Sequence, residues 1–169
     1  LLPLFTKKIP QEEFGVVGIL WLAVPILTRL INLGVDVAVT LKFFKLTHKE
    51  LSNYLYNALL IILLLSLGIW LLFYFNISWV KLLLDESINK QLFTVFFFSI
   101  FSAVLLTMMN AFLQLSGKAS QNVIFSLLPP IITSAVTYYL IIFIEPSYSS
   151  YIYGMATGNG IFGLVTMLI

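Results

Sequence analysis

The sequence is poor in reactive and charged side chains. Its 169 residues include no cysteine and one histidine, and Asp, Glu, Lys and Arg together make up 9%. Without cysteine there is no disulfide, no thiolate metal site and no cysteine nucleophile. Soluble domains carry about a quarter charged residues, so this composition excludes a soluble enzyme. The net charge of +2 comes with no basic stripe and gives no basis for binding nucleic acid.

Apolar residues are abundant instead. Hydrophobic residues make up 60% of the chain, and the mean hydropathy is +1.04, which also excludes a disordered chain. A helix needs about 20 apolar residues to cross the hydrocarbon core of a membrane. Apolar runs such as residues 59–65 lack the alternation that a transmembrane β-strand requires. The sequence predicts an all-α, polytopic transmembrane helical bundle.

The predicted bundle is one domain with four complete and two partial helices. The complete helices are expected at residues 14–34, 48–75, 91–113 and 121–144, and the partial ones at residues 1–6 and 149–169. Charged residues gather between the membrane-crossing stretches, as in residues 35–53, so the helix at 48–75 is expected to start outside the bilayer and to cross it at 54–75. Thr47 and Glu50 have the spacing of a capping box at the start of the second complete helix. Because both chain ends are apolar, we expect the chain to be part of a longer protein.

One charge, Arg29, is expected well inside a membrane-crossing stretch, and it is the first candidate for function. Ionisable groups inside a membrane are costly and are functional candidates by default. On one continuous helix Arg29, Asn32 and Asp36 share a face, and Pro25 one turn earlier is expected to kink that helix. In one interpretation Arg29 and Asp36 form a pair that only holds helices together. In the other, Arg29 lines a cavity that receives an anionic substrate.

Two further patterns lie near membrane boundaries or inside helices. Lys42 and Lys45 form either a solvated patch facing anionic lipid or a cytoplasmic vestibule for a phosphate headgroup. Pro129 and Pro130 must bend the fourth complete helix, as a static kink or as a hinge. Threonines and glycines nearby favour close packing between helices: Thr133, Thr137, Gly154 and Gly158.

No pattern indicates enzyme chemistry. His48 stands beside Lys49 without the spacing of a metal site. The two carboxylate pairs, residues 12–13 and 85–86, are adjacent in the chain, whereas paired acid–base catalysis needs carboxyl groups that face each other. We therefore predict no catalytic residue, no metal site and no cofactor.

Several motifs, in order, resemble one family of membrane proteins. Residues 10–15 (PQEEFG) resemble the P-x-E-x-[FY]-G signature of bacterial polysaccharide exporters, the O-antigen-type lipid-linked oligosaccharide flippases of the MOP (MATE-like) superfamily. The passage LGVDVA at residues 33–38 and the basic aromatic stretch KFFK at 42–45 are similar to that family as well. So are NAFLQLSGK at residues 110–118 and the glycine-rich start of the last helix at 153–158.

The resemblance implies a fold and a function. The chain would be most of an N-terminal six-helix lobe of a protein in a bacterial inner membrane. That protein would flip oligosaccharide or polysaccharide repeat units linked to undecaprenyl diphosphate, by alternating access. The implied partners are this lipid-linked glycan, membrane lipids, the C-terminal lobe of the same chain and polysaccharide polymerase machinery. Arg29 would supply the cavity's positive charge, with Asn32 and Asn110 as polar candidates and Asp36 as a carrier of a coupling ion.

The sequence leaves open both the orientation of the bundle in the membrane and the function of the protein. The loops on each side of the membrane carry four lysines, so the lysine count does not decide the orientation. The distribution of acidic residues weakly favours a cytoplasmic location for the side with Lys42, Lys45, Lys49 and Lys118. The topology of the resembled family agrees with that side. The competing functions are a cation-coupled multidrug or metabolite antiporter of the related branch and a membrane scaffold that does not transport.

Overall fold

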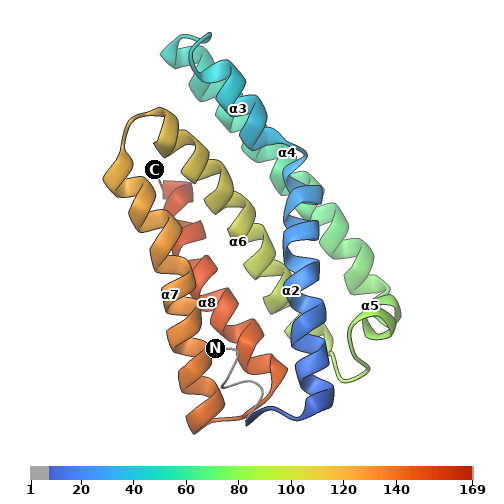
Figure 1. The fold of residues 1–169 in the computed structure, drawn as a ribbon. Helices are drawn as coiled ribbons and strands as arrows, with labels where there is room; N and C mark the ends of the chain where they lie inside the picture. The colour runs from blue at the N-terminus through green and yellow to red at the C-terminus, as the bar shows by residue number, and fades with distance from the viewer. Residues whose placement is uncertain (1–7, 169) are drawn as a thin grey trace.

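The protein is all-helical throughout the part that the structure describes. The computed structural model describes residues 8–168, so the predicted helix end at residues 1–6 lies outside the described residues. Seven helices fill the described part, and no strand is present there (Figure 1). They are α2 (Gln11–Asn32), α3 (Val35–Phe43), α4 (His48–Phe75), α5 (Ile77–Leu83), α6 (Lys90–Leu115), α7 (Ala119–Phe143) and α8 (Tyr148–Leu168).

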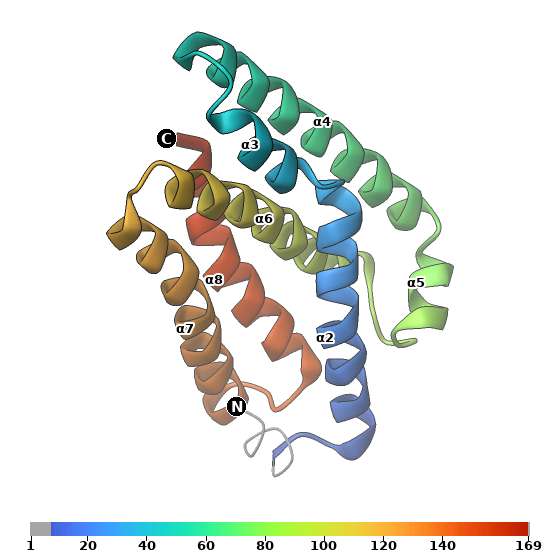
Figure 2. The same cartoon turned by 45° about the horizontal axis from the view of Figure 1, so that its top comes forward.

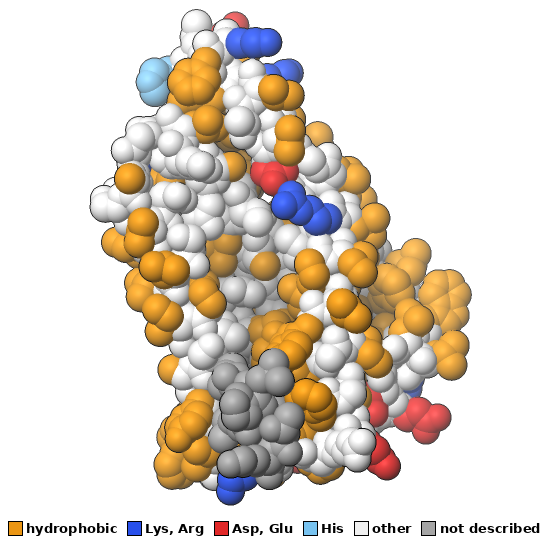
Figure 3. Space-filling view, in the orientation of Figure 1, with side chains coloured by type: hydrophobic (Ala, Val, Ile, Leu, Met, Phe, Trp, Pro, Cys, Tyr) orange, Lys and Arg blue, Asp and Glu red, His pale blue; other side chains and the backbone are white. Residues whose placement is uncertain are grey.

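Four of these helices are long and apolar enough to cross a membrane. They are α2, α4, α6 and α7, and they occupy the regions of the four predicted complete helices. Helix α4 spans the same residues as predicted, and the other ends differ by one to three residues. Helix α8 is not among the four, so the predicted count of four complete and two partial membrane helices stays a prediction. Figure 3 shows apolar side chains over most of one face, with charged ones mainly toward its two ends.

Helix α6 is the centre of the bundle. It packs against α2, α3, α4, α7 and α8, and Figures 1 and 2 show α7 and α8 on one side of it and α2 to α5 on the other. Its sequence is apolar around the whole helix, which is the pattern of a buried helix. Ile100 and Val104 are completely buried in the core that results. The bundle therefore consists of two groups of helices that share α6.

Glycines let α8 approach both of its neighbours closely. A Cβ on Gly154 would stand 2.0 Å from Thr137 Oγ1, and one on Gly158 would stand 2.5 Å from the Pro129 carbonyl of α7. On another face, a Cβ on Gly163 would stand 2.6 Å from the Ser102 Cβ of α6. At Gly158 and Gly163 the overlapping atoms include backbone, so no larger residue fits there without movement of a helix. The small-residue pattern on α8 thus acts as the close-packing motif that the sequence predicts.

The helix that carries Arg29 ends earlier than the sequence predicts. Leu33 and Gly34 both adopt left-handed backbone conformations, with φ of 47° and 74°, and the Leu33 N–H donates to the Arg29 carbonyl. A new helix, α3, then begins at Val35, inside the predicted linker of residues 35–53. The expectation that Arg29, Asn32 and Asp36 lie on one continuous helix is therefore wrong. Glycine supplies part of the reason, because it takes a left-handed conformation without steric cost and ends helices readily.

Candidate functional site

An ion pair joins α2 to α3 across this break. Arg29 Nη1 donates to Asp36 Oδ2 at 2.9 Å, and Asp36 Oδ1 also accepts from the Val37 N–H. The Arg29 side chain is 69% exposed, whereas that of Asp36 is only 16% exposed. In Figure 3 one adjoining pair of blue and red side chains lies over the junction of the two helices. The break thus holds a carboxylate in place and leaves a guanidinium within reach of a ligand.

Two asparagines carry buried polar atoms without a partner. Asn32 is 0% exposed, and neither its Oδ1 nor its Nδ2 has a hydrogen-bond partner among the described residues. The same holds for Asn110 Oδ1 on α6 and for Thr28 Oγ1, one turn before Asn32 on α2. A buried polar group without a hydrogen bond costs about 1–3 kcal/mol. The bundle therefore retains polar groups that this arrangement of helices leaves unsatisfied.

The two lysines predicted to form a vestibule have different surroundings. The Lys42 ammonium lies 4.7 Å from the centroid of the Tyr54 ring, a cation–π contact that ties α3 to α4. Lys45 is exposed after the end of α3. A pocket of about 730 Å³ opens nearby, but its lining includes Phe43 rather than either lysine. The vestibule role of Lys42 and Lys45 stays a prediction.

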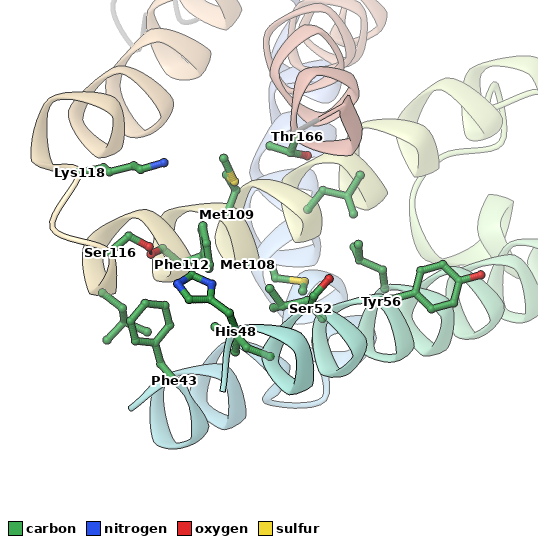
Figure 4. Close-up of a pocket in the computed structure, with 15 residues that line it drawn as sticks. Phe43, His48, Ser52, Tyr56, Met108, Met109, Phe112, Ser116, Lys118 and Thr166 are labelled. Carbon is green, nitrogen blue, oxygen red and sulfur yellow. Dashed lines mark hydrogen bonds between the residues drawn. The ribbon is translucent and has the colours of Figure 1, made fainter. Parts of the chain in front are cut away.

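The pocket is lined by residues that the sequence analysis did not assign to a site. Its walls come from α4 and α6, with Phe43 of α3 and Thr166 of α8 at its edges. Figure 4 shows His48 and Lys118 facing the same space, next to Met108 and Met109. His48 begins α4, and Lys118 directly precedes α7, so 70 residues of sequence separate the two. No spacing rule links residues that far apart.

The prolines lie inside helices that continue through them. Pro25 is exposed within α2, whereas α7 contains buried Pro129 and exposed Pro130. Pro129 contributes its carbonyl to the close contact with Gly158. A hinge at any of these prolines stays a prediction, and the observed role of Pro129 is to pack against α8.

A second polar cluster lies at the opposite end of the bundle. The Glu13 carboxylate on α2 accepts a hydrogen bond from the Tyr148 N–H at 3.0 Å, at the first residue of α8. The Tyr148 hydroxyl lies 2.5 Å from Ser87 Oγ, in the connection before α6. Burial raises the pKa of the Tyr148 hydroxyl, and the hydrogen bond with Ser87 partly offsets that rise. The cluster joins three segments that are distant in sequence.

Removal of the Glu13 carboxylate should loosen the start of α8. A carboxylate at a helix N-terminus satisfies an unpaired N–H and interacts favourably with the helix dipole. We expect Glu13→Ala to lower the free energy of unfolding by about 1 kcal/mol. Hydrogen exchange at the Tyr148 amide would quicken in parallel. Glu12→Ala is the matched control because Glu12 is exposed on the same turn. Equal exchange rates at Tyr148 in the two variants would contradict this role for Glu13.

No family model, curated protein or solved structure matches this chain. The resemblance to the exporters accordingly rests on the motifs of the sequence alone. Among residues 8–168 no group of three His, Asp or Glu side chains is placed to hold a metal ion. At the α2–α3 break the structure brings together one exposed cation, one carboxylate and the unsatisfied amide of Asn32.

Proposed function

We propose that the chain is part of a flippase that moves oligosaccharide or polysaccharide units linked to undecaprenyl diphosphate across a bacterial inner membrane. The observation that carries the proposal is the polar break between α2 and α3. It combines an exposed guanidinium with the buried, partnerless amide of Asn32, in a bundle with four helices apolar enough to cross a membrane. The exporter-like motifs in the sequence support the same substrate class. A substrate with an anionic diphosphate and a polar glycan needs both kinds of group.

Arg29 is the residue suited to the diphosphate. A guanidinium presents several N–H donors in a planar fork that matches phosphate oxygens. In the observed arrangement Asp36 occupies the Nη1 side of that fork. A diphosphate would compete with Asp36 for Arg29, so the ion pair would hold the cation in position while no substrate is bound.

The buried amide groups of the asparagines fit a protein that alternates between two conformations. Asn32 is completely buried against its neighbours, so no substrate can touch it in the observed arrangement. Alternating access requires helices to separate on one side of the membrane and to close on the other. Separation of α2 from the helices that cover it would expose Asn32 to glycan hydroxyls, and a similar opening at α6 would expose Asn110 Oδ1. Hydroxyls can satisfy amide donors and acceptors. The conformation in which these amide groups lack hydrogen-bond partners would then be one of the two conformations of the transport cycle.

This proposal predicts opposite effects of Asn32→Leu on stability and on transport. Leucine has the same branched skeleton of side-chain heavy atoms as asparagine but no polar atom, so it removes the cost of the buried amide. We expect the free energy of unfolding to rise by about 1 kcal/mol or more. Export of glycan by cells that produce the full-length protein should fall at the same time. Unfolding in mixed detergent micelles and surface glycan staining provide the two measurements.

Thr137→Val is the matched control for this experiment. Thr137 Oγ1 is also buried without a partner, but it lies on α7 against Gly154, away from the α2–α3 break. We expect this change to preserve export. Full export by Asn32→Leu would contradict a substrate role for Asn32. Parallel loss of stability and export would instead assign Asn32 a role in folding.

A further inference from the structure

The pocket between α4, α6 and α8 has two chemically different parts. One part is an apolar wall that includes Leu55, Leu105 and Met108. The other is an edge with two strong hydrogen-bond donors, the His48 imidazole and the Lys118 ammonium. The volume of about 730 Å³ lies within the range of about 300–1,000 Å³ that is usual for ligand pockets. The occupant of such a space should have an apolar body and a polar head.

The charges around the pocket favour an anionic head. Among the described residues, no Asp or Glu lines it. Glu50 is close in sequence to His48, but its carboxylate accepts hydrogen bonds from the Thr47 N–H and hydroxyl in the capping box. Lys118 therefore faces the pocket without a competing carboxylate on its lining.

We infer that this pocket binds an anionic phospholipid of the surrounding membrane. The phosphate contacts Lys118 and His48, and one acyl chain lies along the wall formed by α4 and α6. The pocket opens to the surface, because its lining residue Tyr56 on α4 is 66% exposed. Both helices are long and apolar enough to span a bilayer. Met108 and Met109 suit a flexible chain because unbranched thioethers adapt to irregular shapes. The pocket adjoins Phe43 at the end of α3, whereas Asp36 lies at the start of that helix. The inferred lipid site does not depend on the proposed transport function.

Photo-crosslinking tests this site in the intact protein. The full-length protein is placed in nanodiscs of zwitterionic phosphatidylcholine that contain a trace of photoactivatable phosphatidylglycerol. After irradiation, mass spectrometry maps the labelled peptides. We expect labels on α4 between Leu51 and Leu59 and on α6 between Leu105 and Leu115. Unlabelled phosphatidylglycerol should compete, whereas added phosphatidylcholine should not.

Three variants separate the contributions of charge and of space. Lys118→Gln should reduce labelling of the pocket about fivefold, the effect of one lysine on an anionic lipid, and His48→Gln should reduce it further. Leu55→Trp keeps both donors but fills the apolar wall, and it should reduce labelling as well. Lys49→Gln is the matched control, because Lys49 lies on the first turn of α4 without lining the pocket. Size-exclusion profiles and helical circular dichroism verify that each variant is folded.

Several results would overturn the inference. Equal competition by the two phospholipids would show that the headgroup charge is not recognised. An equal loss of labelling in Lys49→Gln and Lys118→Gln would indicate attraction to the surface in general. Protection by inorganic phosphate as strong as that by phosphatidylglycerol would identify a free-anion site. Protection by an isoprenyl diphosphate but not by phosphatidylglycerol would assign the pocket to the transported substrate.

Discussion

Gly158→Ala should destabilise the protein by about 3 kcal/mol, at the upper end of the cost of overpacking. The added Cβ would lie 2.5 Å from the Pro129 carbonyl oxygen and 2.8 Å from the Thr133 nitrogen of α7. Both are backbone atoms, so rotation of a side chain cannot relieve the overlap. Helices α7 and α8 would have to separate along their contact. Unfolding in mixed detergent micelles measures the loss.

Gly68→Ala is the matched control on α4. Nothing lies within 4 Å of a Cβ at Gly68, so the substitution meets open space. Alanine favours a helix over glycine by about 0.8–1.0 kcal/mol, and this control should therefore be neutral or slightly stabilising. A loss of stability in Gly158→Ala no larger than in Gly68→Ala would contradict close packing of α8 on α7.

Replacement of Arg29 should impair transport far more than stability. A hydrogen bond to a charged group contributes about 1.5–3 kcal/mol, which corresponds to about a 10- to 100-fold loss of substrate affinity in Arg29→Ala. Arg29→Lys keeps the charge but loses the planar fork, so its loss should be intermediate. The ion pair with Asp36 is largely exposed on the Arg29 side, and such pairs contribute about 0–1 kcal/mol to stability. Glycan export and unfolding are measured in the same set of variants.

Asp36→Asn separates a substrate role from a structural pair. If Arg29 binds substrate, removal of the competing carboxylate should preserve export, because the cation remains available. If the pair only holds α2 to α3, either single change should lower stability, and the Arg29→Ala, Asp36→Asn double change should restore it. Lys81→Ala controls for loss of a positive charge, since Lys81 is exposed on α5. Full export by both Arg29→Ala and Arg29→Lys would contradict the substrate role.

The helices could be read from the sequence because their signals are local. Long apolar runs predicted the four candidate spans, and the Thr47–Glu50 capping box predicted the start of α4, where the structure has it. Glycines at helical spacing predicted the tight contact of α8. The end of α2 was predicted within two residues, but the new helix α3 directly after it was missed. Leu33, of a residue type that rarely does so, adopts a left-handed conformation beside Gly34 at this junction. The backbone preference of leucine does not predict a left-handed conformation at this position.

The polar contacts between distant segments could not be predicted in the same way. Glu13 meets Tyr148 across 135 positions, and the adjacent Glu12 has the same chemistry and a different environment. Only the packing of α2 beside α8 distinguishes the two carboxylates. His48 and Lys118 likewise come together because α4 begins at the end of the bundle where α6 ends. The Arg29–Asp36 pair was one of two interpretations from the sequence, although the two residues meet across a helix break and not along one continuous helix.

Transport by purified protein tests the central proposal most directly. The full-length protein is reconstituted into liposomes that contain a fluorescent oligosaccharide linked to undecaprenyl diphosphate. A membrane-impermeant reductant then reports how fast the label reaches the outer leaflet. We predict that wild-type protein moves the label faster than protein-free liposomes, and that Arg29→Ala lowers the rate about tenfold or more. Equal rates in wild-type and protein-free liposomes would contradict the account.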